Sequence, residues 1–151
     1  MSTARVLLVA TATLLIIPPV VFAAVALHSG MSIGDALAAL TEQYQASRLN
    51  LLVTSLVGLF PMLLLLVFLG VRRLLKKPPQ ANVMYAIAGV LPPVLVTVFI
   101  HFEFWPTFLP GRTYPGFPHG LEFIIGPAVF APVGMLIALV FAWLFVRRES
   151  A

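Results

Sequence analysis

Four long apolar runs alternate with short polar segments along this chain. They extend over residues 6–27, 49–71, 83–101 and 123–146, and none contains Asp, Glu, Lys or Arg. A helix of about 20 apolar residues crosses the hydrocarbon core of a bilayer. The pattern therefore predicts an all-α integral membrane protein, a four-helix bundle with up-down-up-down topology. Residues 1–151 form one membrane domain, with no room for a separate soluble domain.

The composition favours the same class of protein. Hydrophobic residues make up 61% of the chain and charged residues 9%, whereas soluble domains contain roughly 25% charged residues. A soluble fold of this size could not bury so much apolar surface, so lipid must cover it. There is no cysteine, which excludes disulfides, thiolate metal sites and cysteine nucleophiles.

The distribution of Lys and Arg predicts the orientation of the bundle. Seven of the nine basic residues flank one side of the predicted membrane domain: Arg5, Arg72, Arg73, Lys76, Lys77, Arg147 and Arg148. Only Arg48 and Arg112 fall on the other side. The positive-inside rule then places both termini in the cytoplasm, with the protein in the inner membrane. Arg72, Arg73, Lys76 and Lys77 are also candidate contacts for lipid headgroups.

The first apolar run could alternatively be a cleaved signal peptide, because Ala24, Val25 and Ala26 resemble a cleavage site. The run is longer than the usual 7–15 residues of a signal-peptide core, so we expect it to stay as a span.

Matching positions suggest that the chain consists of two related hairpins. Pro18-Pro19-Val20 in the first span corresponds to Pro92-Pro93-Val94 in the third, and His28 corresponds to His101, at offsets of 74 and 73 residues. Short matches of this kind also arise by chance between apolar helices. A duplicated hairpin and a chance match therefore both stay open. Prolines occur in every span and predict kinks, at Pro18, Pro19, Pro61, Pro92, Pro93, Pro127 and Pro132. They can equally be an ordinary feature of membrane helices.

The first outer segment, residues 28–50, predicts a short amphipathic helix. Ser32 and Asp35 form an approximate capping box at its start. Ile33, Leu37, Leu40 and Tyr44 then share one face at helical spacing. We expect this helix to rest on the outer interface as a cap on the bundle.

The second outer segment, residues 102–121, is rich in aromatic residues, proline and glycine. Its four prolines and three glycines exclude a regular helix throughout. Such a loop can form a recognition surface, and the candidate partner-binding residues are Trp105, Phe108, Arg112, Tyr114 and Phe117. The alternative is an ordinary interfacial belt of aromatic side chains.

All three histidines fall at the predicted outer interface. Together with two nearby acids they form a candidate site for a divalent metal or haem, comprising His28, His101, Glu103, His119 and Glu122. In an up-down-up-down bundle we expect spans one and three to be diagonal, with His28 and His101 at similar depth. The spacing matches no known ligand motif, so we predict no cofactor and expect the three histidines to be solvated or hydrogen-bonded to headgroups.

No catalytic motif is present. An ion pathway needs ionisable groups within the membrane. The polar groups that the spans offer are chiefly the hydroxyls of Thr11, Thr13, Thr54, Ser55, Thr97 and Tyr85. We therefore expect a protein that is not an enzyme and has no nucleic-acid partner. The first remaining class binds another membrane protein through its outer face, as an accessory or assembly subunit, or as an immunity protein against a pore-forming toxin. The second class is a small transporter or a metal- or haem-binding membrane protein that uses the outer histidines.

Overall fold

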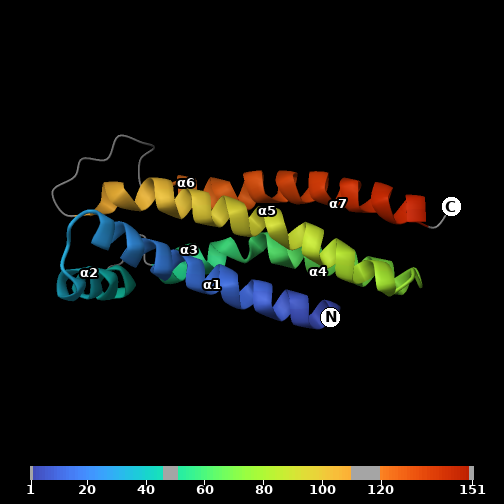
Figure 1. Cartoon of the computed structure of the whole chain (residues 1–151), viewed down its shortest axis with the longest axis horizontal. Helices are drawn as coiled ribbons and strands as arrows, with labels where there is room; N and C mark the ends of the chain where they lie inside the picture. Colours follow the sequence, from blue (N-terminus) through green and yellow to red (C-terminus); the bar gives the residue numbers. More distant parts are fainter. Residues whose placement is uncertain (1, 46–50, 110–119, 150–151) are drawn as a thin grey trace.

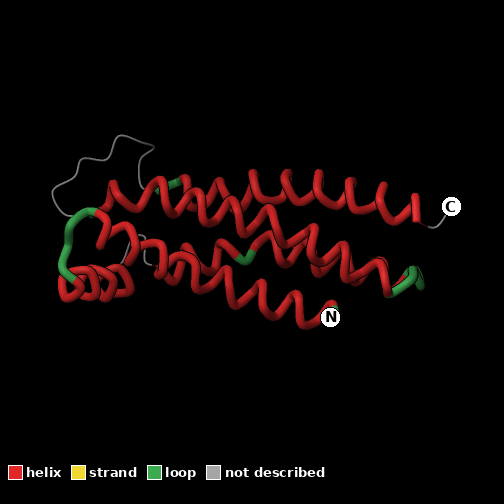
Figure 2. Tube along the Cα trace, in the orientation of Figure 1, coloured by secondary structure: helices red, strands yellow, loops and turns green. Residues whose placement is uncertain are grey.

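The computed structural model describes residues 2–45, 51–109 and 120–149, and these fold into a bundle of four apolar helical spans. The spans cover Thr3–His28, Leu52–Leu74, Ala81–Thr107 and Glu122–Arg148. They lie side by side along the long axis of the molecule (Figure 1). Figure 2 shows helices joined by short loops, and the described residues contain no strand. The predicted all-α four-span bundle is confirmed.

The helical elements subdivide three of the four spans. In chain order they are α1 (Thr3–His28), α2 (Ile33–Gln45), α3 (Leu51–Gly58), α4 (Phe60–Leu74), α5 (Gln80–Phe104), the 3₁₀ helix η1 (Trp105–Phe108), α6 (Glu122–Ile125), the π-helix η2 (Gly126–Phe130) and α7 (Ala131–Glu149). The second span consists of α3 and α4, the third of α5 and most of η1, and the fourth of α6, η2 and α7. The helix α2 is additional to the spans.

The two ends of the bundle differ in chemistry. The N-terminus, the C-terminal end of α7 and the turn between α4 and α5 lie together at one end (Figure 1). We call this the basic end, because it carries Arg5, Arg72, Arg73, Lys76, Lys77, Arg147 and Arg148. The opposite end, called the far end, holds α2, η1 and α6 (Figure 1). It corresponds to the side predicted as outer.

The third span, α5, is the centre of the bundle and packs against both α1 and α7. The expected diagonal separation of spans one and three is therefore wrong. Ala10 of α1 and Ala86 of α5 are both buried in the same apolar core. The shared core and the packing of the two helices along their length make α1 and α5 direct neighbours.

Glycines bring α5 close to its other partners. A Cβ on Gly134 of α7 would lie 3.0 Å from Cβ of Pro92, and one on Gly89 of α5 would lie 2.5 Å from Cδ1 of Leu65 in α4. A Cβ on Gly126 would overlap Ile100. These contacts leave no space for larger side chains at the three positions, so α5 packs closely against α4, η2 and α7 there.

Proline shapes the spans in two ways. Pro61 lies at the start of α4, directly after the interruption that separates it from α3. Pro19 lies inside the continuous helix α1, where it cannot donate to the carbonyl of Leu15. The Ser55 hydroxyl of α3 donates to that carbonyl over 3.5 Å, so a neighbouring span supplies a replacement donor.

Two helices end in the same turn at opposite ends of the bundle. After α1, Met31 N–H donates to Ala26 O and Gly30 N–H donates to Leu27 O, with Gly30 at φ +88°. After α4, Lys77 N–H donates to Arg72 O, with Lys76 at φ +52°. Both are Schellman motifs, which reverse the chain after a helix.

The outward faces of the spans are apolar along the whole bundle. Large exposed side chains include Leu8, Val67, Leu95 and Phe141, one from each span. A soluble monomer rarely exposes apolar surface on this scale. The exposed faces fit the hydrocarbon core of a bilayer, and the protein is a multi-pass membrane protein.

Candidate functional site

The far end of the bundle contains an aromatic cluster that joins three spans. Trp105 of η1 packs edge-on against Phe22 of α1, with 5.1 Å between ring centroids. Phe123 of α6 lies 4.7 Å from Trp105 and 4.8 Å from His101, measured between ring centroids. We call these four residues the far-end cluster. It fixes the ends of spans one, three and four relative to one another.

Trp105 is the centre of this cluster and has no exposed surface (0%). A fully buried indole has no surface free for a partner here, so Trp105 packs the cluster in this structure, and its role in partner binding stays a prediction. The sequence suggested an interfacial side chain because Trp105 lies among prolines and aromatics at a span end. Its burial depends on Phe22, which lies far away in the sequence, and no local pattern indicates that contact.

His101 is also buried, with 2% of its surface exposed. Its Nδ1 atom has no hydrogen-bond partner among the described residues, and neither does Oγ1 of Thr97, one helical turn earlier. These two polar groups lie on the same face of α5 because residues four apart in a helix are neighbours.

Glu122, the first residue of α6, is buried as well. The expectation of a solvated side chain is wrong for His101, which is buried at the same end of the bundle. The predicted runs ended at or beside these residues, whereas the helices Ala81–Thr107 and Glu122–Arg148 include them. The bundle thus contains buried ionisable side chains near its far end. Such groups inside the spans were not predicted from the sequence. Intramembrane ionisable residues are commonly functional.

The candidate metal-binding residues do not gather in the described part of the chain. His28 and Glu103 are exposed, while His101 and Glu122 are buried. No three His, Asp or Glu side chains among the described residues could hold one metal ion. His119 lies outside the described residues, so the five-residue set stays a prediction.

The other candidate partner-binding residues follow the far-end cluster in sequence. Phe108 is the last residue of η1, and Arg112, Tyr114 and Phe117 lie outside the described residues. The described flanks of this segment are held in the bundle, since Leu109 and Gly120 are both buried.

The predicted amphipathic helix is present as α2 and packs beside α1. Its start is capped as expected, because Asp35 N–H donates to Ser32 Oγ at 3.2 Å and Ser32 Oγ donates to Asp35 Oδ2 at 2.7 Å. The helix buries Ala36, whereas Ile33 and Leu37 are 71% and 56% exposed. Three residues of the predicted stripe, Ile33, Leu37 and Tyr44, are therefore available for contact with an interface, whereas Leu40 is partly buried and packs against the bundle core.

The candidate lipid-contact residues at the basic end divide into two groups. Arg72 is half-buried, and its Nε donates to Oδ1 of Asn82 at 2.9 Å. Its guanidinium carbon lies 4.1 Å from the ring centroid of Tyr85. Arg72 therefore joins α4 to α5. Arg73, Lys76 and Lys77 are exposed and remain available for headgroups.

The fold and its apolar faces define the chain as a small four-span membrane protein. No protein family, no curated protein and no solved structure matches it.

Proposed function

We propose that this protein acts without catalysis, by binding another membrane protein through its far end. The observation that carries the proposal is that the residues flanking the segment 110–119 are packed in the bundle. Trp105 and Phe123, on either side of residues 110–119, pack on each other. A proline-rich segment with anchored ends loses little conformational entropy when it binds.

The composition of the segment supports a protein partner. Tyr114, Phe117 and Arg112 belong to residue types that are enriched at the centres of protein interfaces. The helix α2 lies at the far end (Figure 1), and its side chains Ile33, Leu37 and Tyr44 are exposed. The composition of residues 110–119 and these exposed side chains together offer aromatic and apolar groups to a partner.

The positive-inside rule supports an orientation for this surface. With seven of the nine Lys and Arg residues at the basic end, we propose that this end is cytoplasmic and that the membrane is the inner membrane. The far end then faces outward. A partner would be a subunit of a membrane complex, or a pore-forming toxin that approaches from outside.

Site-specific photo-crosslinking tests the proposal. A photoreactive amino acid at Tyr114 or Phe117 should capture a discrete protein in cells, identified by mass spectrometry, and the same partner should co-purify with the unmodified chain. Matched probes at Val67 and Phe141, on lipid-facing helix surfaces, should capture lipid. Equal protein adducts from all four positions, or lipid alone from Tyr114 and Phe117, would contradict the proposal.

The identity of the captured protein separates the two partner types. An accessory role predicts that deleting this chain lowers the amount of an intact membrane complex on a native gel. An immunity role predicts that deletion leaves complexes unchanged and sensitises cells to a toxin added outside.

A transport or ligand-binding role is the second candidate. Buried His101 and Glu122 support it, because ionisable groups in membrane bundles often mark pathways or ligand sites. The absorption spectrum and metal content of the purified protein distinguish this role. The first proposal predicts a colourless, metal-free sample, and a haem band or stoichiometric metal would favour the second.

A further inference from the structure

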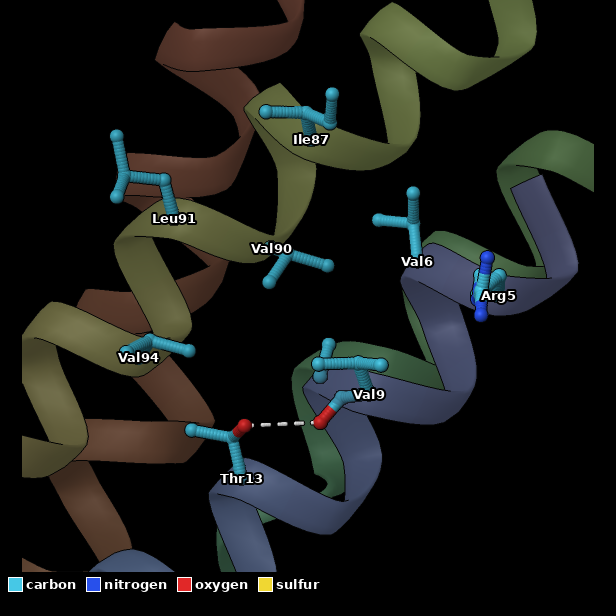
Figure 3. Close-up of a pocket in the computed structure, with 9 residues that line it drawn as sticks. Arg5, Val6, Val9, Thr13, Ile87, Val90, Leu91 and Val94 are labelled. Carbon is cyan, nitrogen blue, oxygen red and sulfur yellow. Dashed lines mark hydrogen bonds between the residues drawn. The ribbon is translucent and has the colours of Figure 1, made fainter. Parts of the chain in front are cut away.

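A cavity of about 480 Å³ lies between α1 and α5 in the half of the bundle nearest the basic end. Figure 3 shows α1 and α5 on opposite sides of it. Among the described residues, its lining comes from two helices: Arg5, Val6, Val9, Ala10 and Thr13 of α1, and Ile87, Val90, Leu91 and Val94 of α5. Side chains of these two neighbouring helices therefore form the walls of an apolar groove.

The groove is apolar and open to the surroundings of the bundle. Val9 and Leu91 line it and are 59% and 56% exposed. The hydroxyl of Thr13 donates to the carbonyl of Val9 at 2.9 Å, so this polar group is already satisfied. Water would find few partners here, whereas an acyl chain would bury apolar surface on both sides.

One charged residue lies at the end of the groove. Arg5 lines it from the first turns of α1, and its side chain is exposed. Eight residues separate Arg5 from Thr13, about 12 Å along a helix. The groove thus combines an apolar track with a permanent cation at the membrane surface, and the planar guanidinium suits bidentate bonding to phosphate.

We propose that this groove binds one acyl chain of an anionic phospholipid, with the lipid phosphate on Arg5. Charge complementarity selects this occupant, because Arg5 places a cation in the lining at the end of the groove. The bound chain fills the space between α1 and α5 and completes their contact. The proposal does not depend on what the far end binds.

Native mass spectrometry of the full chain tests this site, using mixed micelles that contain phosphatidylglycerol or phosphatidylcholine. The unmodified protein should retain one phosphatidylglycerol and little phosphatidylcholine. Arg5→Gln should lower retention of phosphatidylglycerol about tenfold, the scale of a lost charge-assisted bond. Arg148→Gln, which removes an exposed cation of the same end outside the groove, should leave retention unchanged.

A second pair of variants tests the apolar track. Val9→Phe should reduce retention of the lipid by filling the groove, whereas Leu8→Phe, an exposed neighbour that does not line it, should not. Size-exclusion elution and helical circular dichroism verify that each variant folds. Equal retention of the two lipids, or equal losses in Arg5→Gln and Arg148→Gln, would overturn the proposal in favour of diffuse attraction to the basic end.

Discussion

At the scale of single residues, burial of polar groups inside an apolar bundle is the main feature that the sequence did not predict. Thr97 is fully buried beside His101 on α5, yet its hydroxyl has no hydrogen-bond partner among the described residues. By contrast, the hydroxyl of Thr13 bonds within its own helix. The two threonines look alike in sequence and differ only in tertiary surroundings.

This difference predicts the effect of removing each hydroxyl. Val has nearly the shape of Thr, and an unsatisfied buried polar group costs about 1–3 kcal/mol. Thr97→Val should therefore raise the free energy of unfolding by about 1 kcal/mol, seen as a higher Tm in detergent. Thr13→Val, the matched control, should change it by less than about 0.5 kcal/mol. A lower Tm for Thr97→Val would show that the hydroxyl makes a bond that the described residues do not contain.

His101 and Trp105 show why the burial of a polar or aromatic side chain at a span end is hard to predict from sequence. Both lie at the end of an apolar run, where position alone favours the interface. Their burial follows from contacts with Phe22 and Phe123, which come from other spans. Only the packing of three helices reveals it.

At the scale of elements, hydrophobic periodicity and capping chemistry predicted most of the helices. The four spans and α2 appear where expected, and Ser32 caps α2 through Asp35 as its spacing indicated. The interruption of the second span between Gly58 and Phe60 and the π-helix Gly126–Phe130 were not located in advance. The prolines predicted irregular helices in these two spans. They did not predict that one irregularity is a break in the helix and the other a π-helix.

The tight contact between α5 and α7 leads to a prediction about glycine. Gly134→Leu places a large side chain against Pro92, whose ring cannot move aside, and overpacking costs about 1–3 kcal/mol. A loss of this size should appear as a lower Tm in detergent. Gly70→Leu provides the control, because a Cβ on Gly70 meets nothing within 4 Å. It should leave stability unchanged or raise it through helix propensity. Equal destabilisation by both variants would contradict the close approach of α5 and α7.

At the scale of the whole molecule, the sequence predicted the architecture and the unequal ends, but not which helices touch. The central position of α5 depends on small residues such as Ala86 and Gly134, whose partners become evident only after the helices pack. The suggested duplication stays a prediction. Its paired histidines differ in surroundings, since His28 is exposed and His101 is buried.

The orientation of the bundle decides which end can meet a partner outside the cytoplasm. Because the chain has no cysteine, single cysteines report their position without interference. The direct test is labelling of Ser29→Cys, Lys77→Cys and Ser2→Cys with a membrane-impermeant maleimide, in intact and in permeabilised cells. Ser29→Cys should react in intact cells, whereas Lys77→Cys and Ser2→Cys should react only after permeabilisation. Reaction of Lys77→Cys in intact cells, or labelling that places Ser2 and Lys77 on opposite sides, would contradict a four-span protein with its basic end in the cytoplasm.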